Sequence, residues 1–78
     1  MGEVGRLQWK CRRGMKELDL VLLDYLHQRY SAAAAAEQQA FESLLEQQDP
    51  TLFAYLTGRE RPADEHQRHV IDALRRTT

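Results

Sequence analysis

Apolar residues recur at intervals of three and four along most of this 78-residue chain, and no segment alternates apolar and polar residues. The first spacing places apolar side chains on one face of an α-helix, whereas strict alternation is typical of a half-buried strand. The sequence therefore predicts an all-α protein, a compact single-domain bundle of five short helices. We expect these helices at about residues 2–13, 16–30, 32–47, 49–57 and 62–76, within one domain spanning residues 1–78.

Capping and turn-forming residues separate these helices. Ser31 is the expected N-cap of the third helix, because its hydroxyl can accept a hydrogen bond from a free backbone N–H. Asp49 and Pro50 are typical of a helix start, with Asp as the cap and Pro at the first helical position. Gly58 is expected to end this fourth helix, and Pro62 to begin the fifth.

The apolar faces of the helices predict the core. Its expected members are Leu7, Cys11, Leu18, Val21, Leu22, Tyr25, Leu26, Ala40, Phe41, Leu44, Leu45, Leu52, Phe53, Leu56, Val70, Ile71 and Leu74. The five alanines at residues 32–36 have two interpretations. They allow another helix to approach closely, or they form a solvent-exposed turn of good helix formers.

Size and composition restrict the classes of function. A chain of this length buries only about 60% of the surface that it exposes when unfolded, so it has little room for a deep substrate cavity. Its net charge of −1 argues against a general nucleic-acid binder. The single cysteine excludes an internal disulfide and fits a reducing compartment. No apolar signal segment follows Met1, and we expect a cytoplasmic protein.

The charges are unevenly distributed along the chain. Residues 1–16 contain five basic residues and one acidic residue, whereas residues 17–49 contain seven acidic residues and one basic residue. Such a separation orients encounters with a partner and carries no information about the fold. We therefore look for a functional surface near the basic N-terminal segment.

Trp9 lies in this basic segment. At 100° per residue it falls about 160–200° from Leu7 and Cys11, so the indole is expected opposite the core face. Arg6 and Arg13 lie at similar angles. A tryptophan in a small protein more often belongs to the core, but an exposed tryptophan among arginines is typical of an interface hot spot.

The adjacent sequence Arg13-Gly14-Met15-Lys16-Glu17 also has two interpretations. It marks a helix boundary, in which the glycine ends one helix, the arginine interacts with its dipole and the glutamate begins the next helix. Alternatively it forms an exposed recognition corner. Gly14 would then let another protein's backbone approach, while Arg13 and Glu17 would offer complementary charges.

The remaining candidate groups do not predict catalysis or a metal site. His66 and His69 share a helix face, but the sequence offers no obvious third and fourth ligand for zinc. Cys11 belongs to an apolar face and has no adjacent histidine that would activate it as a nucleophile. We expect no catalytic residues and no bound metal in this chain.

The segment from Trp9 to Asp19, WKCRRGMKELD, closely resembles the opening of the bacterial SdhE family, which are succinate dehydrogenase assembly factors. The resemblance continues to Asp64 and covers most of the chain. Its later positions are Phe41, Leu44, Leu45, Asp49, Pro50, Leu52, Phe53, Leu56, Pro62, Ala63 and Asp64. Tyr55, where many members carry tryptophan, and the alanine run at residues 32–36 depart from the family pattern.

The resemblance implies a five-helix fold and an accessory function. Members bind the flavoprotein subunit of succinate dehydrogenase, and often of fumarate reductase, and promote the covalent attachment of FAD. The linkage joins a histidine of the flavoprotein to the flavin 8α-methyl group, so both reacting groups lie outside this chain. The resemblance leaves open whether the chain contacts FAD directly, and we expect a monomer with no cofactor of its own.

The family signature Arg-Gly-x-x-Glu maps onto Arg13, Gly14 and Glu17. Helix geometry adds four neighbouring candidates for partner binding, which are Arg6, Trp9, Arg12 and Met15. Two other classes remain as alternatives, namely a small helical DNA-binding or regulatory module and a generic adaptor for another oxidoreductase. In the DNA-binding alternative the recognition helix would be the acidic, alanine-rich one, which phosphates repel.

Overall fold

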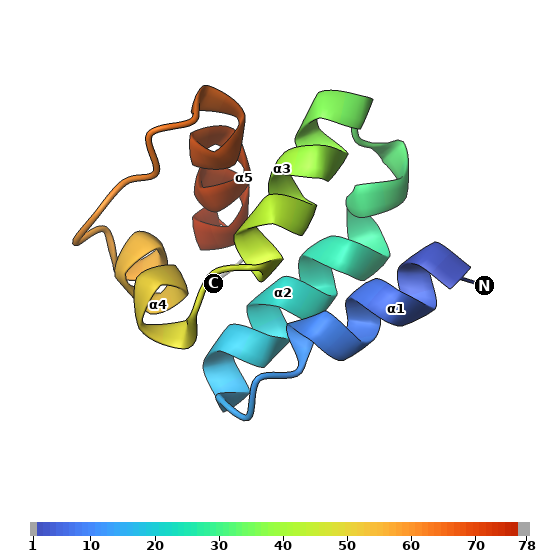
Figure 1. The fold of residues 1–78 in the computed structure, drawn as a ribbon, viewed down its shortest axis with the longest axis horizontal. Helices are drawn as coiled ribbons and strands as arrows, with labels where there is room; N and C mark the ends of the chain where they lie inside the picture. Colours follow the sequence, from blue (N-terminus) through green and yellow to red (C-terminus); the bar gives the residue numbers. More distant parts are fainter. Residues whose placement is uncertain (1, 77–78) are drawn as a thin grey trace.

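Five α-helices joined by short turns make up the computed structural model, which describes residues 2–76 and the side chains of residues 5–76 (Figure 1). They are α1 (Gly2–Cys11), α2 (Lys16–Gln28), α3 (Ala35–Leu45), α4 (Asp49–Thr57) and α5 (Glu65–Arg76), with a short 3₁₀ helix, η1 (Tyr30–Ala32), before α3. The described residues contain no β-strand. The prediction of an all-α fold with five helices is therefore confirmed.

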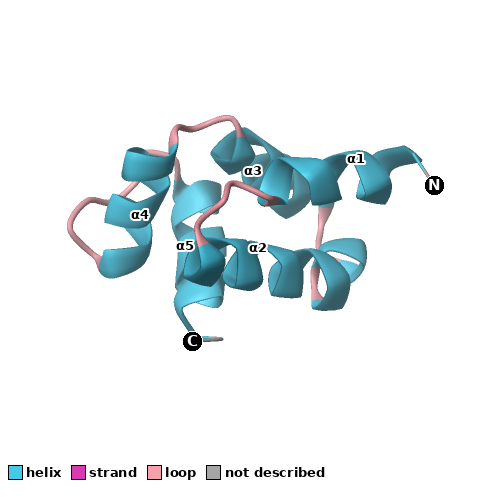
Figure 2. Cartoon of the chain, turned by 90° about the horizontal axis from the view of Figure 1, so that it is seen from below, coloured by secondary structure: helices cyan, strands magenta, loops and turns pink. Residues whose placement is uncertain are grey.

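The helices enclose one core. α3 packs along α5, α1 packs against α2, and α4 packs against α5 (Figures 1 and 2). The Cα radius of gyration is 11.3 Å, close to the roughly 11.5 Å expected for a compact domain of this length. No helix in residues 2–76 has the length and apolar character needed to cross a membrane.

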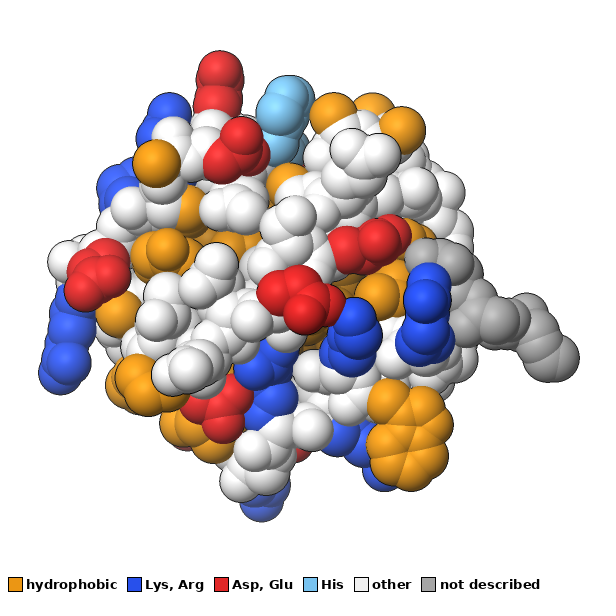
Figure 3. Space-filling view, viewed as in Figure 1, with side chains coloured by type: hydrophobic (Ala, Val, Ile, Leu, Met, Phe, Trp, Pro, Cys, Tyr) orange, Lys and Arg blue, Asp and Glu red, His pale blue; other side chains and the backbone are white. Residues whose placement is uncertain are grey.

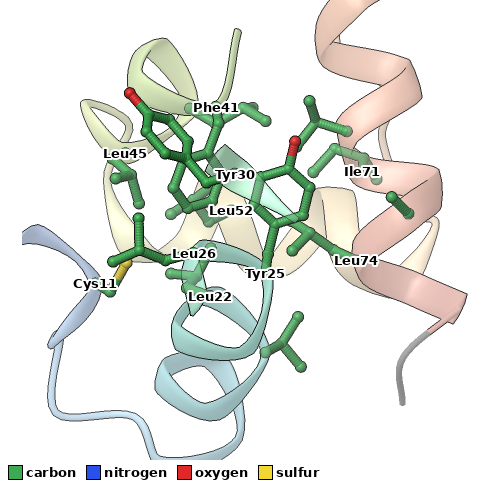
Figure 4. Packing of buried hydrophobic residues seen from close by; sticks show 14 of the residues in the cluster. Cys11, Leu22, Tyr25, Leu26, Tyr30, Phe41, Leu45, Leu52, Ile71 and Leu74 are labelled. Atoms are coloured by element: carbon green, nitrogen blue, oxygen red, sulfur yellow. The ribbon is translucent and has the colours of Figure 1, made fainter. Parts of the chain in front are cut away.

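Aromatic and aliphatic side chains from α1, α2, α3, α4 and α5 fill the core (Figure 4). Phe41 lies at its centre, with the Tyr25 ring stacked on it at 4.5 Å between centroids and the Tyr30 ring tilted against it at 5.8 Å. The two tyrosine hydroxyls donate hydrogen bonds to the carboxylates of Glu37 and Glu42. Both rings are thus buried while their polar ends have partners, as buried tyrosines require.

The connection between α2 and α3 differs from the prediction. α2 ends at Gln28, and Ser31 lies within η1 instead of capping α3. The chain then passes through extended backbone at Ala34, which is the N-cap and has no side-chain capping hydrogen bond. The buried Tyr30 explains this path, because its carbonyl oxygen accepts a hydrogen bond from the Gln38 side chain on α3. The alanine run is largely exposed; Ala32 ends η1, Ala33 and Ala34 connect the two helices, and Ala35 and Ala36 begin α3.

The fourth and fifth helices begin close to the predicted positions. Gln48 is the N-cap of α4, so Asp49 is its first residue, and Gly58 ends the helix with φ of +83° as expected. α5 begins at Glu65, three residues after Pro62, because the Asp64 carboxylate accepts a hydrogen bond from a backbone N–H of the first turn. A side-chain cap of this kind fixes the first residue of a helix more firmly than a proline does.

Candidate functional site

The carboxylate of Asp19 holds the turn between α1 and α2 in place through hydrogen bonds. The backbone N–H groups of Arg13 and Gly14 donate hydrogen bonds to the two side-chain oxygens of Asp19, at 2.9 and 3.2 Å. Gly14 has φ of +82°, the left-handed region that L side chains rarely adopt. A Cβ atom added to Gly14 would meet no atom within 4 Å. The glycine is therefore required by the backbone conformation, and the space above it is open.

The Arg13 side chain turns inward beneath this turn. Its Nη1 donates hydrogen bonds to the Gln47 carbonyl at 2.8 Å and to Asp49 Oδ1 at 3.0 Å, and its Nη2 donates to the Leu45 carbonyl. The guanidinium group thus caps the C-terminal end of α3 and pairs with the first residue of α4. Only 12% of the side chain is exposed. The expectation that Arg13 offers an exposed charge is wrong, because free carbonyls at a helix end need donors.

Three of the predicted site residues are exposed around the turn, namely Trp9, Arg12 and Glu17. The Trp9 side chain is 77% exposed, which confirms the position opposite the core that its angle predicted. Gly5, Gln8, Trp9 and Arg12 line a shallow depression of about 250 Å³ along one face of α1. An exposed indole next to a guanidinium group is a frequent composition of protein interfaces.

The other two candidates have different surroundings, and Arg6 lines a depression between α1 and α3. Arg6 is exposed on α1. Met15 is half-buried and packs against the core. Lys and Arg side chains are visible over α1 and the turn that follows it (Figure 3). The structure therefore exposes Trp9, Arg12, Gly14 and Glu17 around the turn, and it places the Arg13 side chain beneath the turn.

Internal ion pairs reduce the positive charge that the sequence suggested for this region. Lys10 Nζ lies 2.5 Å from Glu46 Oε2 on α3, and the hydrogen bond and charge of Lys10 lower the pKa of Glu46. Arg13 is paired with Asp49. Two of the five cations in residues 1–16 are thus used to hold α1 and the turn against α3 and α4.

A protein-family model described as "Flavinator of succinate dehydrogenase" matches residues 5–78. The chain belongs to this family. The FAD assembly factor SdhE of Methylococcus capsulatus is 55% identical over 64 residues, which cover 82% of this chain and 77% of that protein. The protein of the same name from Aliivibrio fischeri is 40% identical over 72 residues, covering 92% of this chain and 84% of its own. The resemblance seen in the sequence is confirmed.

Within this member of the flavinator family, Cys11 offers no nucleophile. The thiol is fully buried next to the turn. Burial raises its pKa to about 11, an effect that the positive charge of Arg13 offsets in part. The thiol therefore stays protonated near neutral pH, whereas a reactive cysteine needs the thiolate form. Residues 5–76 contain no cluster of three side chains that could hold a metal ion.

This family member has exposed apolar side chains near the corner that the apolar pattern of the sequence does not predict. Phe53 was assigned to the core, but it is 39% exposed, and Leu20 on α2 is 60% exposed. The signal was present in α4, where Leu52, Phe53, Tyr55 and Leu56 are all apolar. A short helix cannot turn all of these toward one core, since Leu52 and Phe53 point 100° apart. Leu52 is buried and Phe53 is not.

Proposed function

We propose that this chain binds the flavoprotein subunit of succinate dehydrogenase and promotes the covalent attachment of FAD to it. Membership of the flavinator family and the names of the relatives support the proposal. The structural observation that carries it is the corner at Gly14, where open space lies above a glycine and an exposed carboxylate, Glu17, stands one turn away. The partner's backbone approaches Gly14, and the surrounding side chains contact it.

The corner consists of an exposed layer and a supporting layer. Trp9, Arg12, Gly14 and Glu17 make the exposed layer, with Arg6 and Met15 beside them. Arg13 supports them from below by tying the turn to α3 and α4. A surface that is already fixed before binding loses little conformational freedom in the complex, which favours affinity.

The chain acts by positioning and supplies no reacting group. Its thiol is buried and protonated, and both groups that form the covalent bond belong to the flavoprotein and its FAD. Holding a nucleophile and an electrophile in near-attack geometry accelerates a reaction by itself. We therefore assign the chain an accessory, non-catalytic function, in which it holds the flavoprotein in an arrangement that places its histidine next to the flavin.

We extend the proposal in three respects. The flavoprotein subunit of fumarate reductase is a second partner, since it would present the same chemistry to the corner. The chain acts as a monomer in the cytoplasm. It holds no cofactor of its own and does not insert into the membrane.

The proposal is tested by co-expressing the chain with the flavoprotein subunit in cells that lack their own assembly factor. Covalent FAD is then measured as flavin fluorescence in a denaturing gel. We expect Gly14→Arg to reduce this fluorescence at least about tenfold, because the arginine occupies the space that the partner's backbone needs. Gly14→Ala is the matched control, since it introduces the same strain at positive φ with much less bulk.

We expect the alanine variant to be as strained as the arginine variant and to retain more flavinylation. Circular dichroism should show that both variants keep their helices. Flavinylation that is unaffected by Gly14→Arg would refute the proposed corner. Equal loss in the two variants would attribute the effect to the backbone of the turn and not to close approach.

A further inference from the structure

A groove opens beside the corner, between α2, α4 and α5. It has a volume of about 200 Å³ and is lined by Glu17, Leu18, Val21, Phe53, Leu56, Thr57 and Arg75. Four of these residues are apolar. α4 packs against α5 beside this groove, and α2 contributes three of its lining residues, among them Glu17, which also belongs to the corner.

Apolar groups at the surface continue around this groove. Phe53 on α4 lines it and is 39% exposed, and Leu20 lies near Glu17 on the exposed side of α2 and is 60% exposed. Isolated exposed apolar residues are common, but a hollow lined by them next to a binding site is typical of an interaction surface. Glu17 lines the groove and also belongs to the corner, so the two surfaces adjoin.

The contact area of the corner alone is too small for a stable complex. A standard interface takes about 800 Å² and 20–30 residues from each partner. The corner offers six surface residues on a chain whose whole accessible surface is 5007 Å². A standard interface would therefore cover roughly one sixth of that surface and must extend beyond the corner. An interface that extends along α1 would include the depression at Trp9, and one that extends toward α4 would include the groove.

The charged residues of the groove indicate which kind of partner segment it binds. Among the residues that the structure describes, no hydrogen bond or ion pair joins the Glu17 carboxylate to another group. Glu17 stands at the groove and is exposed, so a cation brought there would form a new ion pair. Arg75 also lines the groove, and its guanidinium group lies beside Gly58 at the end of α4. The apolar lining and the free carboxylate of Glu17 fit a segment that carries an apolar side chain next to a basic one, which pairs with Glu17.

We propose that this groove receives an apolar side chain of the flavoprotein subunit, with a neighbouring lysine or arginine of the same segment paired to Glu17. This inference rests on the proposed function and extends it by giving the binding surface a second part with its own chemistry. Hot spots in interfaces are typically apolar anchors in such pockets, surrounded by polar contacts. In this arrangement Gly14 lets the partner's backbone approach closely, and the groove supplies most of the apolar contact.

The test measures the affinity of the purified chain for the purified flavoprotein subunit by isothermal titration calorimetry. Thr57→Arg fills the groove from an exposed position, and Phe53→Ala removes part of its wall. We expect each to weaken binding about tenfold or more. Ser31→Arg is the matched control for the first variant, since Ser31 is exposed on η1 and does not line the groove.

The ion pair is tested separately with Glu17→Gln. We expect about five- to tenfold weaker binding at low salt, and a smaller dependence of the affinity on salt than in the wild type. Unfolding in urea is measured for every variant, and Thr57→Arg carries the test if Phe53→Ala lowers stability. A salt dependence equal to that of the wild type would overturn the assignment of a basic residue to Glu17.

The outcomes separate this inference from the proposed function. If Gly14→Arg abolishes binding while Thr57→Arg and Phe53→Ala bind as tightly as the wild type, the groove proposal is wrong and the proposed function stands. If the wild type does not bind the flavoprotein, both are wrong. If the chain alone forms a dimer in sedimentation equilibrium and Phe53→Ala makes it monomeric, the groove receives a second copy and the proposal is overturned.

Discussion

Arg13 joins three elements through its guanidinium group and its backbone N–H. It donates to carbonyls at the end of α3 and to the carboxylate at the start of α4, while its backbone N–H binds Asp19 on α2. Lysine keeps the charge but cannot reach several acceptors in the same planar arrangement. We expect Arg13→Lys to lower the free energy of unfolding by about 1–3 kcal/mol, measured by urea denaturation.

Its neighbour Arg12 provides the control for this prediction. Arg12 is exposed, so Arg12→Lys should change stability by less than about 0.5 kcal/mol. If Arg13→Lys is as stable as the wild type but binds the flavoprotein more weakly, Arg13 acts directly on the partner. The supporting role that its hydrogen bonds indicate would then be wrong.

Cys11 provides a prediction about pH. Burial raises the pKa of its thiol from 9.0 to about 11. Above pH 9 the unfolded chain loses this proton and the folded chain keeps it, so the unfolded state is favoured as pH rises through this window. We expect the stability advantage of the wild type over Cys11→Ala, measured in urea, to shrink between pH 9 and 11. An advantage that stays constant would show that the folded thiol ionises normally.

For single residues, the sequence predicts burial or exposure correctly where the environment is set by neighbours on the same helix. The exposure of Trp9 follows from its angle to Leu7 and Cys11 on the same helix. The burial of the Arg13 side chain did not follow, because its acceptors Leu45, Gln47 and Asp49 lie more than thirty residues further along the chain. No local pattern encodes that contact, and it is formed only when α3 and α4 pack against the turn.

Among the elements, the α1–α2 turn carries the corner that we propose binds the flavoprotein. Asp19 lies in the first turn of α2 and accepts hydrogen bonds from two backbone N–H groups of the turn that precedes it. Asp19→Ala leaves both N–H groups without this partner, at a cost of about 1–2 kcal/mol. We expect faster amide hydrogen exchange at Arg13 and Gly14, together with weaker flavoprotein binding.

Asp64→Ala is the matched control for Asp19→Ala. It removes a comparable helix cap at α5, far from the corner in sequence, and should lower stability by about 1 kcal/mol while leaving affinity unchanged. If both variants weaken binding equally, loss of overall stability explains the effect. Exchange at Gly14 that does not increase in Asp19→Ala would show that the turn holds its shape without the carboxylate.

The element boundaries show what a sequence pattern can specify. All five helices and most of the core were predicted, because apolar spacing and capping residues are local signals. The prediction that Ser31 caps α3 is wrong, because Tyr30 is buried and residues 30–32 form η1 instead. Phe53 was wrongly placed in the core, because the pattern of α4 does not say which apolar residue meets the other helices. Tertiary packing decided both cases.

The whole molecule combines a core of aromatic and aliphatic side chains with a corner held from two sides. Asp19 fastens the turn to α2, and Arg13 fastens it to α3 and α4, so the corner cannot move independently of the bundle. A protein of 78 residues has little stability to spare. In the proposed function, these contacts hold the corner in one shape before the partner binds.

The single tryptophan makes the last prediction measurable in the complete complex. Trp9 is the only tryptophan of the chain and is 77% exposed. If the chain is produced with 5-fluorotryptophan, it should give one ¹⁹F resonance near the position of the unfolded chain. Adding the unlabelled flavoprotein subunit should shift and broaden this resonance, because the indole becomes buried against the partner. The labelled Gly14→Arg variant should show no such change, and an unchanged resonance in a wild-type complex that calorimetry detects would place Trp9 outside the interface.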